Sequence, residues 1–554
     1  MKNIKFSNLN RDKIISKLSK EDYDLVVIGG GITGGGIALD AASRGMKVAL
    51  VEKNDFASGT SSKSTKLIHG GLRYLKQFDF WLVKEVGSER AIVHKLAPHL
   101  VLPEKMLLPL IENGSYGKWL TSIGLKVYDI LAQVTGDDKR KMLEKKEALK
   151  LEPLLPKKIL KGAGYYAEYR TDDARLTIEN IKTSLQFGAT ALNYAMVKDF
   201  VYKENKISGV VINDAISGKE FKIKTKYVIS AAGPWVDELR SVNNSKKGKR
   251  LHLTKGVHLV FPKEKLPVKQ SVYFDIPDGR MMFAIPRGKV TYVGTTDTNY
   301  NNDKDHVRTD LADAIYLLSA VNNMFPKINL EMEDIVSSWA GLRPLIHEEG
   351  KSASELSRKD EIFTSDTGLI SIAGGKLTGY RKMAERVVDR IAKKLEEDYD
   401  VEVKPCNTEN IPLCGNDFKK YKHVKKYISE IHKRIKEDGF TEHDAWFLVT
   451  NYGKQTEAIL EYYKNRTEKD HHTRMILAEL EFGIAYEMVE NPMDFFIRRT
   501  GRLYFDIDSI RDYSKPILNE FKSAYKVDDA QILEWKEILQ EELKEHSDFS
   551  LERA

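Results

Sequence analysis

Residues 23–75 have the sequence YDLVVIGGGITGGGIALDAASRGMKVALVEKNDFASGTSSKSTKLIHGGLRYL, and they decide the fold of the N-terminal part of the chain. An apolar run ends at Ile28. It is followed by Gly29, Gly31 and Gly34, by an alanine-rich segment, and by a second apolar run that closes on Glu52. This order predicts a strand, a tight turn, a helix and a second strand, which together form a dinucleotide-binding unit.

Each part of this unit has a physical task. Gly29 permits the tight turn, Gly31 lets backbone N–H groups approach a pyrophosphate, and Gly34 lets the helix pack closely on the strands. The phosphates would lie at the helix N-terminus, where the dipole and free N–H groups favour negative charge. Glu52 follows Gly29 by 23 residues and can accept hydrogen bonds from ribose hydroxyls. A glycine-rich turn without a ligand would need neither the flanking strands nor the terminal acid.

The loop after Glu52 is rich in small hydroxyl side chains, at Thr60, Ser61, Ser62, Ser64 and Thr65. Hydroxyls and backbone N–H groups in such a loop can satisfy phosphate and ribityl oxygens along an extended cofactor, so FAD fits better than NAD. Two later patches, YVISAAGPW at 227–235 and LISIAGGKLTGYR at 369–381, repeat the pattern of a strand followed by a glycine turn. Three such patches in order favour a composite FAD site over a solvated loop and two ordinary turns.

The composition is typical of a globular protein with about two to four domains. Of its 554 residues, 42% are hydrophobic and 31% are charged. No run of about 18 uncharged apolar residues is present to span a bilayer. The basic N-terminus, MKNIKFSNLNRDKIISKLSK, lacks the apolar stretch of a secretory signal. We therefore expect a cytoplasmic protein, either free or on the cytoplasmic face of a membrane.

The cysteines and the charge set limits on the chemistry. Cys406 and Cys414 are the two cysteines of the sequence. The segment KPCNTENIPLCG fits neither a zinc knuckle nor a disulfide framework, so we predict two free thiols and no metal site. The formal net charge of +7 is modest for this length. It does not indicate a nucleic-acid partner, and it suits acidic small molecules or an anionic membrane surface.

Hydrophobic periodicity predicts an α/β and α+β architecture: a Rossmann-like FAD-binding domain interwoven with an antiparallel-sheet substrate domain, plus a C-terminal α-helical cap. Segments 79–155 and 400–554 have helical spacing, whereas 193–227 and the later runs HLVF, VYF, MMFAIP and VTYVGTTD are strand-like. The predicted boundaries are 1–20 for a lead-in; 21–95, 150–240 and 360–395 for a discontinuous FAD-binding domain; 96–149 for a helical insertion; 241–359 for the substrate-binding domain; and 400–554 for the helical domain.

Six motifs follow one another along the chain: GGGITGGGIALDAASRG, TSSKSTKLIHGGLRYL, AAGPWVD, VGTTDT, GLRPL and GGKLTGYRK. In this order the sequence resembles the aerobic, quinone-linked family of FAD-dependent glycerol-3-phosphate dehydrogenases. The resemblance covers residues 20–390 closely, and the segment DFFIRRTGRLYFD is similar to the C-terminal cap of that family. TSSKSTKLIHGGLRYL is specific to the group, whereas many flavoproteins share the glycine triplet.

The resemblance implies a reaction and an electron acceptor. Sn-glycerol 3-phosphate would be oxidised to dihydroxyacetone phosphate by hydride transfer from C2 to N5 of FAD, with the electrons passed to a membrane quinone. Oxidases that are similar pass electrons to O₂, and they carry an insertion in mid-chain that this sequence lacks, which favours a dehydrogenase. The oligomeric state stays open, and a homodimer is compatible with the sequence.

The resemblance also implies positions around the substrate and the cofactor. A phosphate clamp would comprise Arg73, Tyr74, Arg343, Arg358 and Lys376, because the arginine fork suits bidentate phosphate recognition and lysine supplies a point charge. For Arg358, in the charged stretch SELSRKDE, a solvated surface role competes. The predicted cofactor contacts are Gly29, Gly31, Gly34, Glu52, Lys53, Thr60, Ser61, Ser62, Ser64, Leu67, Gly71, Gly233, Gly375, Lys376, Leu377 and Thr378.

The alcohol proton requires a general base. His69, between the hydroxyl-rich loop and Gly70-Gly71, is the favoured candidate. His258, within LTKGVHLVF, is the second candidate, although a histidine on an apolar strand is more often a hydrogen-bonded core residue. Arg343 could stabilise the developing alkoxide.

Membrane contact without a spanning helix requires a peripheral surface. Residues 418–435 form a predicted amphipathic helix with a lysine-rich polar face, and SKKGKR at 245–250 forms a basic loop. Either could lie on anionic lipid. A helix that packs within its domain and a solvated loop are the competing interpretations.

Two other classes of function remain open. An amino-acid oxidase or dehydrogenase of the same flavoprotein fold would aim an arginine at a carboxylate, whereas several cationic residues suggest a phosphate. A flavin-binding sensor would need neither His69 nor a multi-residue anion clamp. Addition of glycerol 3-phosphate without oxygen would discriminate among them through the flavin absorbance.

Overall fold

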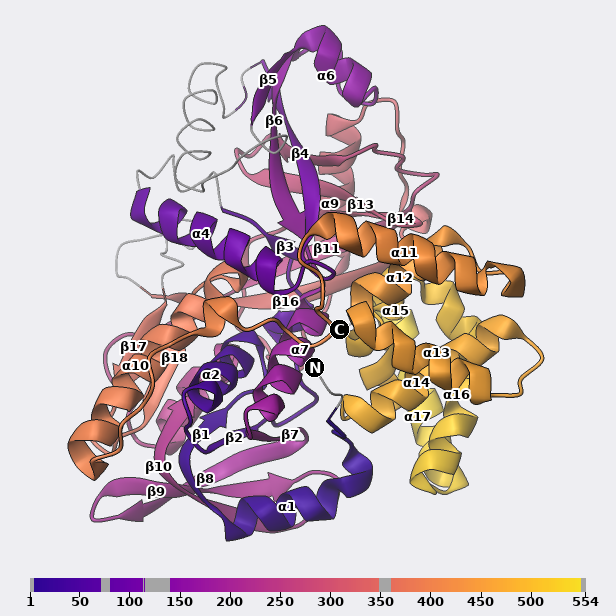
Figure 1. Cartoon of the computed structure of the whole chain (residues 1–554). Helices are drawn as coiled ribbons and strands as arrows, with labels where there is room; N and C mark the ends of the chain where they lie inside the picture. The colour runs from indigo at the N-terminus through magenta and orange to yellow at the C-terminus, as the bar shows by residue number, and fades with distance from the viewer. Residues whose placement is uncertain (1–3, 71–79, 113, 115–139, 348–359, 550–554) are drawn as a thin grey trace.

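The computed structural model describes residues 4–70, 80–112, 114, 140–347 and 360–549. Within these residues the chain forms two sheets and a C-terminal group of helices (Figure 1). None of the described helices is both long enough and apolar enough to cross a membrane. Cys406 and Cys414 are free thiols.

The first sheet, sheet A, has the parallel order that the opening motif predicts. Strand β1 lies between β2 and β10, and β7 and β18 extend the parallel array on either side. Its strands are β1 (Asp22–Ile28), β2 (Val48–Val51), β7 (Thr190–Leu192), β8 (Ala195–Lys203), β9 (Lys206–Asp214), β10 (Glu220–Ser230), β17 (Glu361–Thr364) and β18 (Ile370–Ala373). The near-continuous apolar run of β1 is buried because helices and strands cover both of its faces.

The second sheet, sheet B, is largely antiparallel. Its order is β15-β11-β14-β13-β12-β4-β6-β3, with β16 paired to β11 and β5 to β6. Its strands are β3 (Leu67–Ile68), β4 (Leu102–Ile111), β5 (Lys141–Glu144), β6 (Leu160–Arg170), β11 (Leu251–Pro262), β12 (Ser271–Asp275), β13 (Met281–Arg287), β14 (Val290–Gly294), β15 (Thr298–Asn299) and β16 (Ser337–Ile346).

The helices divide by position. Helices α2, α7 and α10 pack together over sheet A, and α9 packs against sheet B (Figure 1). The helices before residue 400 are α1 (Arg11–Lys20), α2 (Ile32–Ser43), α4 (Phe80–Leu96), α6 (Lys145–Leu151), α7 (Asp173–Gln186), α8 (Val236–Val242), α9 (Leu311–Met324) and α10 (Tyr380–Tyr399).

The chain after residue 400 is helical, which confirms the predicted C-terminal helical cap. Its elements are α11 (Tyr421–Ile435), α12 (Glu442–Tyr452), α13 (Thr456–Asn465), α14 (His471–Tyr486), the π-helical segment η10 (Asp494–Arg499), α15 (Arg502–Phe505), α16 (Ile507–Tyr525) and α17 (Asp529–Ser547). One apolar core joins these helices to sheet B, through residues such as Trp339, Tyr292, Phe496 and Leu503.

One prediction was wrong. The range 96–149, expected to be helical, contains strands β4 and β5, and β4 pairs with β6 along most of its length. A short apolar run such as MLLPLI fits a buried strand or a helix equally well, and only its pairing partner decides. The helical segment expected at 119–133 lies outside the described residues.

The N-terminal lead-in is held in place at two residues, Phe6 and Arg11. Arg11 forms a buried ion pair with Asp214 of sheet A. Phe6 exchanges backbone hydrogen bonds with the C-terminal helices: its N–H donates to Ala485 O (3.0 Å) and its carbonyl accepts from Met488 N (3.0 Å). The segment therefore bridges two parts of the molecule that lie far apart in the sequence.

Candidate active site

The glycine turn between β1 and α2 is shaped by close backbone contacts. Gly29 has φ of 112°, which favours glycine. A Cβ on Gly34 would lie 1.8 Å from the carbonyl oxygen of Gly29. Any larger residue at 34 would push α2 away from β1, so Gly34 has the packing task that the sequence predicts.

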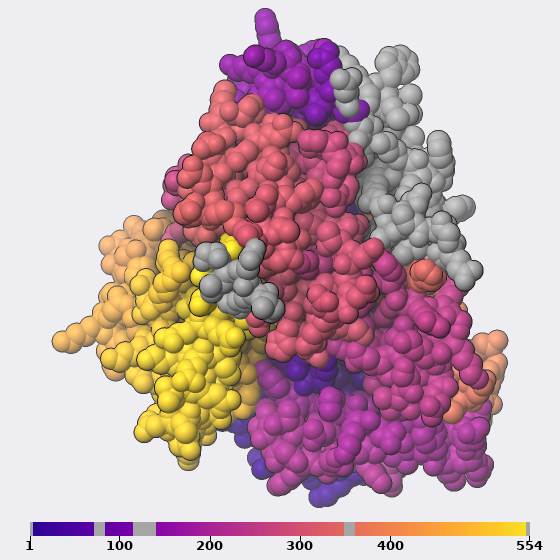
Figure 2. Space-filling view, turned by 180° about the vertical axis from the view of Figure 1, so that it is seen from behind, coloured from indigo at the N-terminus to yellow at the C-terminus, as the bar shows by residue number. Residues whose placement is uncertain are grey.

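A cavity of about 460 Å³ opens beside this turn, at the carboxyl ends of the parallel strands. Eleven predicted cofactor residues line it: Gly29, Gly31, Glu52, Lys53, Thr60, Ser61, Ser64, Gly233, Gly375, Lys376 and Leu377. They come from three regions of the chain, around residues 28–64, 231–242 and 374–383. In the view from behind, indigo atoms of the N-terminal part lie in a hollow between the magenta and red segments (Figure 2).

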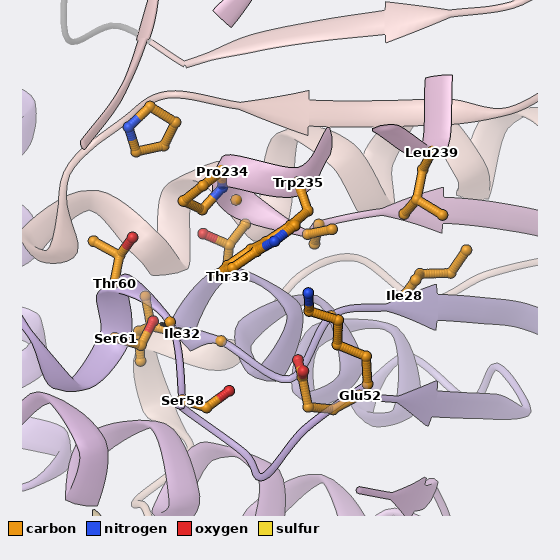
Figure 3. Close-up of a pocket in the computed structure, with 18 of the residues that line it drawn as sticks. Ile28, Ile32, Thr33, Glu52, Ser58, Thr60, Ser61, Pro234, Trp235 and Leu239 are labelled. Carbon is orange, nitrogen blue, oxygen red and sulfur yellow. Dashed lines mark hydrogen bonds between the residues drawn. The ribbon is translucent and has the colours of Figure 1, made fainter. Parts of the chain in front are cut away.

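Glu52 and Trp235 face the cavity from opposite sides (Figure 3). The Glu52 carboxylate accepts hydrogen bonds from the backbone N–H groups of Gly30 (2.6 Å) and Asn54 (2.9 Å). Burial raises its pKa. Lys53 Nζ donates to Asp305 (2.6 Å) and lies 4.3 Å from the centre of the Trp235 ring. These contacts fix the end of β2, where a ribose is expected.

The hydroxyl-rich loop is held by its own side chains. Ser61 Oγ accepts from Ile32 N (2.9 Å) at the start of α2, and Thr60 Oγ1 donates to Leu342 O (2.7 Å). Ser64 Oγ donates to Asp173 Oδ2 (2.6 Å). Ser62 is 1% exposed and lines neither of the cavities described here. Ser62 therefore shapes the loop from behind, and a direct cofactor contact by it is not supported.

A second cavity, of about 150 Å³, adjoins the first. Both are lined by Thr60, Ser64, Gly375, Lys376 and Leu377. The second is also lined by Leu67, His69, His258, Arg343 and Thr378. The three predicted catalytic residues thus line one cavity, although His69 follows β3, His258 lies on β11 and Arg343 lies on β16.

Arg343 lies on β16, beside β11 and the turn after β14. Its Nη1 donates to Thr296 O (2.9 Å) and Asp297 Oδ1 (3.1 Å), and its Nη2 donates to Thr295 Oγ1 (2.7 Å). Gly256 on β11 makes room for the guanidinium, because a Cβ there would lie 2.1 Å from Nη2. The charge-assisted contacts hold the guanidinium in one orientation at the cavity wall.

The two histidines differ in their surroundings. His258 is 1% exposed, stacks on Trp339 (4.8 Å between ring centres), and its Nε2 lies 3.0 Å from Thr65 Oγ1. Burial, with the positive charges of Arg343 and Lys66, holds the pKa of His258 well below its usual value. His69 is half-buried, and its backbone N–H donates to Thr378 Oγ1 (3.1 Å).

Four predicted positions, Gly71, Arg73, Tyr74 and Arg358, lie outside the described residues. The sequence reasoning missed Trp235 as a wall of the first cavity, although AAGPW had marked its neighbourhood. It also missed Asp173, which supports the loop, and Asp297, which supports Arg343. Asp173 belongs to none of the quoted motifs. Asp297 stands in VGTTDT, which was quoted without a role for its aspartate, so that motif was the signal that could have found it.

The first cavity fits a dinucleotide. The twelve-residue helix α2 begins at its wall with Gly31 as N-cap, so its dipole favours a phosphate there. Trp235 Nε1 is buried and has no hydrogen-bond partner among the described residues, which leaves a donor at the wall for a ligand oxygen or nitrogen. Backbone glycines and hydroxyls, rather than bulky side chains, line the side next to the turn.

Comparison with known proteins agrees with this geometry. Residues 24–381 match the model of the FAD dependent oxidoreductase family, and residues 406–532 match the C-terminal domain of alpha-glycerophosphate oxidase. The chain is 52% identical to an aerobic glycerol-3-phosphate dehydrogenase of Bacillus subtilis, over 96% of each chain. The chain belongs to the aerobic glycerol-3-phosphate dehydrogenase family. A Staphylococcus aureus relative of the same name is 48% identical over 97% of each chain.

Two solved structures have an architecture similar to that of this chain. A glycerol-3-phosphate dehydrogenase from Bacillus halodurans, complexed with FAD, is 43% identical and has a TM-score of 0.85 over 99% of this chain and 100% of that one. An L-alpha-glycerophosphate oxidase from Mycoplasma pneumoniae is 20% identical, with a TM-score of 0.55 over 70% of this chain and 98% of that one, and shares the fold. FAD is the cofactor of this family and of this chain.

Proposed function

We propose that the protein oxidises sn-glycerol 3-phosphate to dihydroxyacetone phosphate and passes the electrons to a membrane quinone. The observation that carries the proposal is the second cavity, where Arg343, Lys376 and two histidines meet directly beside the FAD cavity. The names of the relatives at 52% and 48% identity support the same substrate. When bound, FAD supplies the acceptor for the hydride that leaves C2.

The cationic residues would bind the phosphate of the substrate. Arg343 offers a planar fork that is already oriented by its neighbours, and Lys376 adds a point charge from the turn after β18. Arg73, Tyr74 and Arg358 complete the proposed clamp. Alternatively, Arg343 would stabilise the alkoxide that develops at C2.

His69 is the better candidate for the base that takes the hydroxyl proton. His258 is a poor proton acceptor because burial and the adjacent Arg343 disfavour its charged form. Its contacts with Trp339 and Thr65 give it a task in the wall of the cavity. His69 lines the second cavity, and its carbonyl oxygen accepts a hydrogen bond from Thr378 Oγ1.

A peripheral membrane surface would bring the electrons to the quinone. Helix α11 confirms the predicted helix, but its apolar residues Val424, Tyr427, Ile428, Ile431 and Ile435 are buried within the C-terminal core. Its apolar face is therefore not free for lipid. Membrane binding is therefore proposed on electrostatic grounds alone: the exposed lysines of α11 and of the loop at 245–250 would contact anionic lipid headgroups. Salt-sensitive sedimentation with anionic vesicles would test it.

The reaction is tested with the purified holoenzyme in the absence of oxygen. Glycerol 3-phosphate should bleach the oxidised flavin band, while glycerol and an amino acid such as glycine should not. His69→Ala should retain FAD and reduce slowly, whereas His258→Asn should reduce much faster than His69→Ala. An oxidised spectrum that persists with glycerol 3-phosphate would refute the proposed substrate.

A second step in the same experiment identifies the electron acceptor. The reduced flavin is mixed with either a water-soluble quinone or air-saturated buffer. A dehydrogenase should be reoxidised faster by the quinone than by oxygen. Faster reoxidation by oxygen, with formation of hydrogen peroxide, would indicate the oxidase alternative.

A further inference from the structure

Asp55 lies on the loop that carries the FAD contacts, yet its side chain points away from both cavities. The loop runs from Glu52 to Ser58, and both of these residues line the first cavity. Asp55 lies between them, has a side chain that is 0% exposed, and lines neither cavity. Its carboxylate contacts the C-terminal domain instead.

Two arginines of η10 bind this carboxylate. Arg499 donates to both oxygens, with Nη1 2.7 Å from Oδ2 and Nη2 2.8 Å from Oδ1, and Arg498 Nε donates to Oδ2 as well. Asn193 Nδ2 adds a fourth contact at 3.1 Å. Burial alone would raise the pKa of Asp55, but Arg499 and Arg498 hold it below its usual value. The pair is a fully buried, bidentate link between residues 444 positions apart.

Arg499 is itself fixed within the C-terminal domain. It is 0% exposed, and its Nε and Nη2 donate to the carbonyl of Glu487 (3.1 and 2.7 Å). Arg498 also pairs with Asp494 of the same turn (2.5 Å). The guanidinium of Arg499 is thus a rigid anchor that belongs to the helices and reaches into the FAD-binding loop.

The loop needs such an anchor because its backbone is strained. Ala57 has φ of 62°, a left-handed conformation that is unfavourable for alanine. In this conformation its N–H donates to Gly30 O (3.0 Å) in the glycine turn, and Ser58 N donates to Asp55 O (3.2 Å). Asp55 therefore connects the anchor to the residues that hold Glu52, Gly30 and Ser58 in place.

We propose that Asp55 and Arg499 are positioning residues of the FAD site, so that the C-terminal helical domain controls how tightly the cofactor is held. Neither residue lines the two cavities, and the pair acts through the conformation of residues 52–58. The proposal rests on FAD as the cofactor and is independent of the substrate and the electron acceptor. By reciprocity, FAD binding should also stabilise η10.

The first test measures FAD affinity in Arg499→Lys and Asp55→Asn. FAD is removed from each purified variant, and its rebinding is followed by flavin fluorescence without substrate. Both variants should raise the Kd for FAD by about 10-fold or more. The matched control is Arg502→Lys, because Arg502 forms a comparable ion pair with Glu479 (2.7 Å) inside the helical domain. It should change the Kd by less than about twofold at a similar loss of thermal stability.

Two results would overturn the proposal. One is a Kd like that of the wild type in both Arg499→Lys and Asp55→Asn. The other is an equal rise in the Arg502→Lys control, which would show general loosening rather than positioning.

The second test uses the unmodified chain, so it does not depend on whether a variant folds. Hydrogen exchange of the amides in Asp494–Arg499 is compared between the holoenzyme and the protein stripped of FAD. Exchange should slow when FAD is bound, although this segment lines neither cavity. Identical exchange in the two forms would contradict the proposed coupling.

Discussion

Arg343 shows how neighbouring side chains prepare one residue for its task. Its fork is oriented by Thr295, the Thr296 carbonyl and Asp297, so little rotamer freedom is left to lose when an anion binds. The side chain retains some exposure, 20%, at the cavity. A partly desolvated, oriented guanidinium binds a phosphate more strongly than a mobile surface arginine does.

We expect Arg343→Ala to raise KM for glycerol 3-phosphate by about 10- to 100-fold, from a loss of about 1.5–3 kcal/mol for one charged hydrogen bond. Arg343→Lys should recover only part of this, because lysine keeps the charge but lacks the fork. Steady-state kinetics measure the effect. Arg511→Ala serves as the control, since Arg511 forms an exposed ion pair with Asp508 in the C-terminal helical domain. An unchanged KM in Arg343→Ala would remove it from the clamp.

At the scale of elements, strand pairing sets the site. The register places Arg343 on β16 opposite Thr254 on β11, two residues from Gly256. Because side chains on a strand alternate between faces, Thr254 and Gly256 share a face, and the missing side chain of Gly256 leaves the space that the guanidinium fills. An ordinary β-propensity would disfavour glycine in the middle of a strand.

We expect Gly256→Ala to displace the guanidinium and raise KM by about 10-fold or more, the change that one weakened charged contact would cause. The combination with Arg343→Ala gives a double-mutant cycle. If the clash with Arg343 is the cause, the double variant should have the KM of Arg343→Ala alone. Additive effects of the two substitutions would show that Gly256 matters to the strand itself.

At the scale of the whole molecule, buried ion pairs link α7 of the FAD-binding part to Glu487 at the end of α14. Arg175 donates to both oxygens of Glu487 (2.6 and 2.9 Å), and Lys182 donates to the same carboxylate (2.9 Å). These groups are almost fully buried. Such pairs add little stability over apolar contacts, but the loss of one partner leaves an uncompensated buried charge.

We expect the contribution of Glu487 to the stability of the fold to decrease in acid. Burial alone would raise the pKa of Glu487, but Arg175 and Lys182 lower it to about 2. Because the folded-state pKa lies below the unfolded-state value, its contribution to stability is full above about pH 5 and is lost as the pH falls toward about 2.

Glu487→Gln should therefore lower the free energy of unfolding at pH 7 by about 3–5 kcal/mol relative to the wild type. The difference should be smaller at about pH 4, where the wild type has lost part of the contribution of Glu487. Urea unfolding followed by tryptophan fluorescence at the two pH values measures this. Glu437→Gln, at an exposed glutamate of the helical domain, is the control. A difference between wild type and Glu487→Gln that does not shrink with pH would contradict the assignment.

The sequence by itself determined the β1–α2–β2 unit, the strands from 193 to 227, the helical C-terminus and the family. These rest on local physics: glycines that only tight turns and close packing require, period-2 and period-3.6 patterns, and hydroxyls that follow a strand. The assembly of His69, His258, Arg343 and Lys376 came from resemblance, because residues some 300 positions apart share no local signal.

Only the tertiary structure decided the rest. Pairing with β6 made 102–111 a strand, because a short apolar run takes its conformation from its partner. Packing buried the apolar face of α11, which its own periodicity could not distinguish from a lipid-facing one. The contact of Asp55 with Arg499 depends on how the C-terminal helices dock, since nothing near Asp55 in the sequence marks its partner. Local sequence patterns determine local structure. The packing of elements that are distant in the sequence determines which charged side chains contact one another.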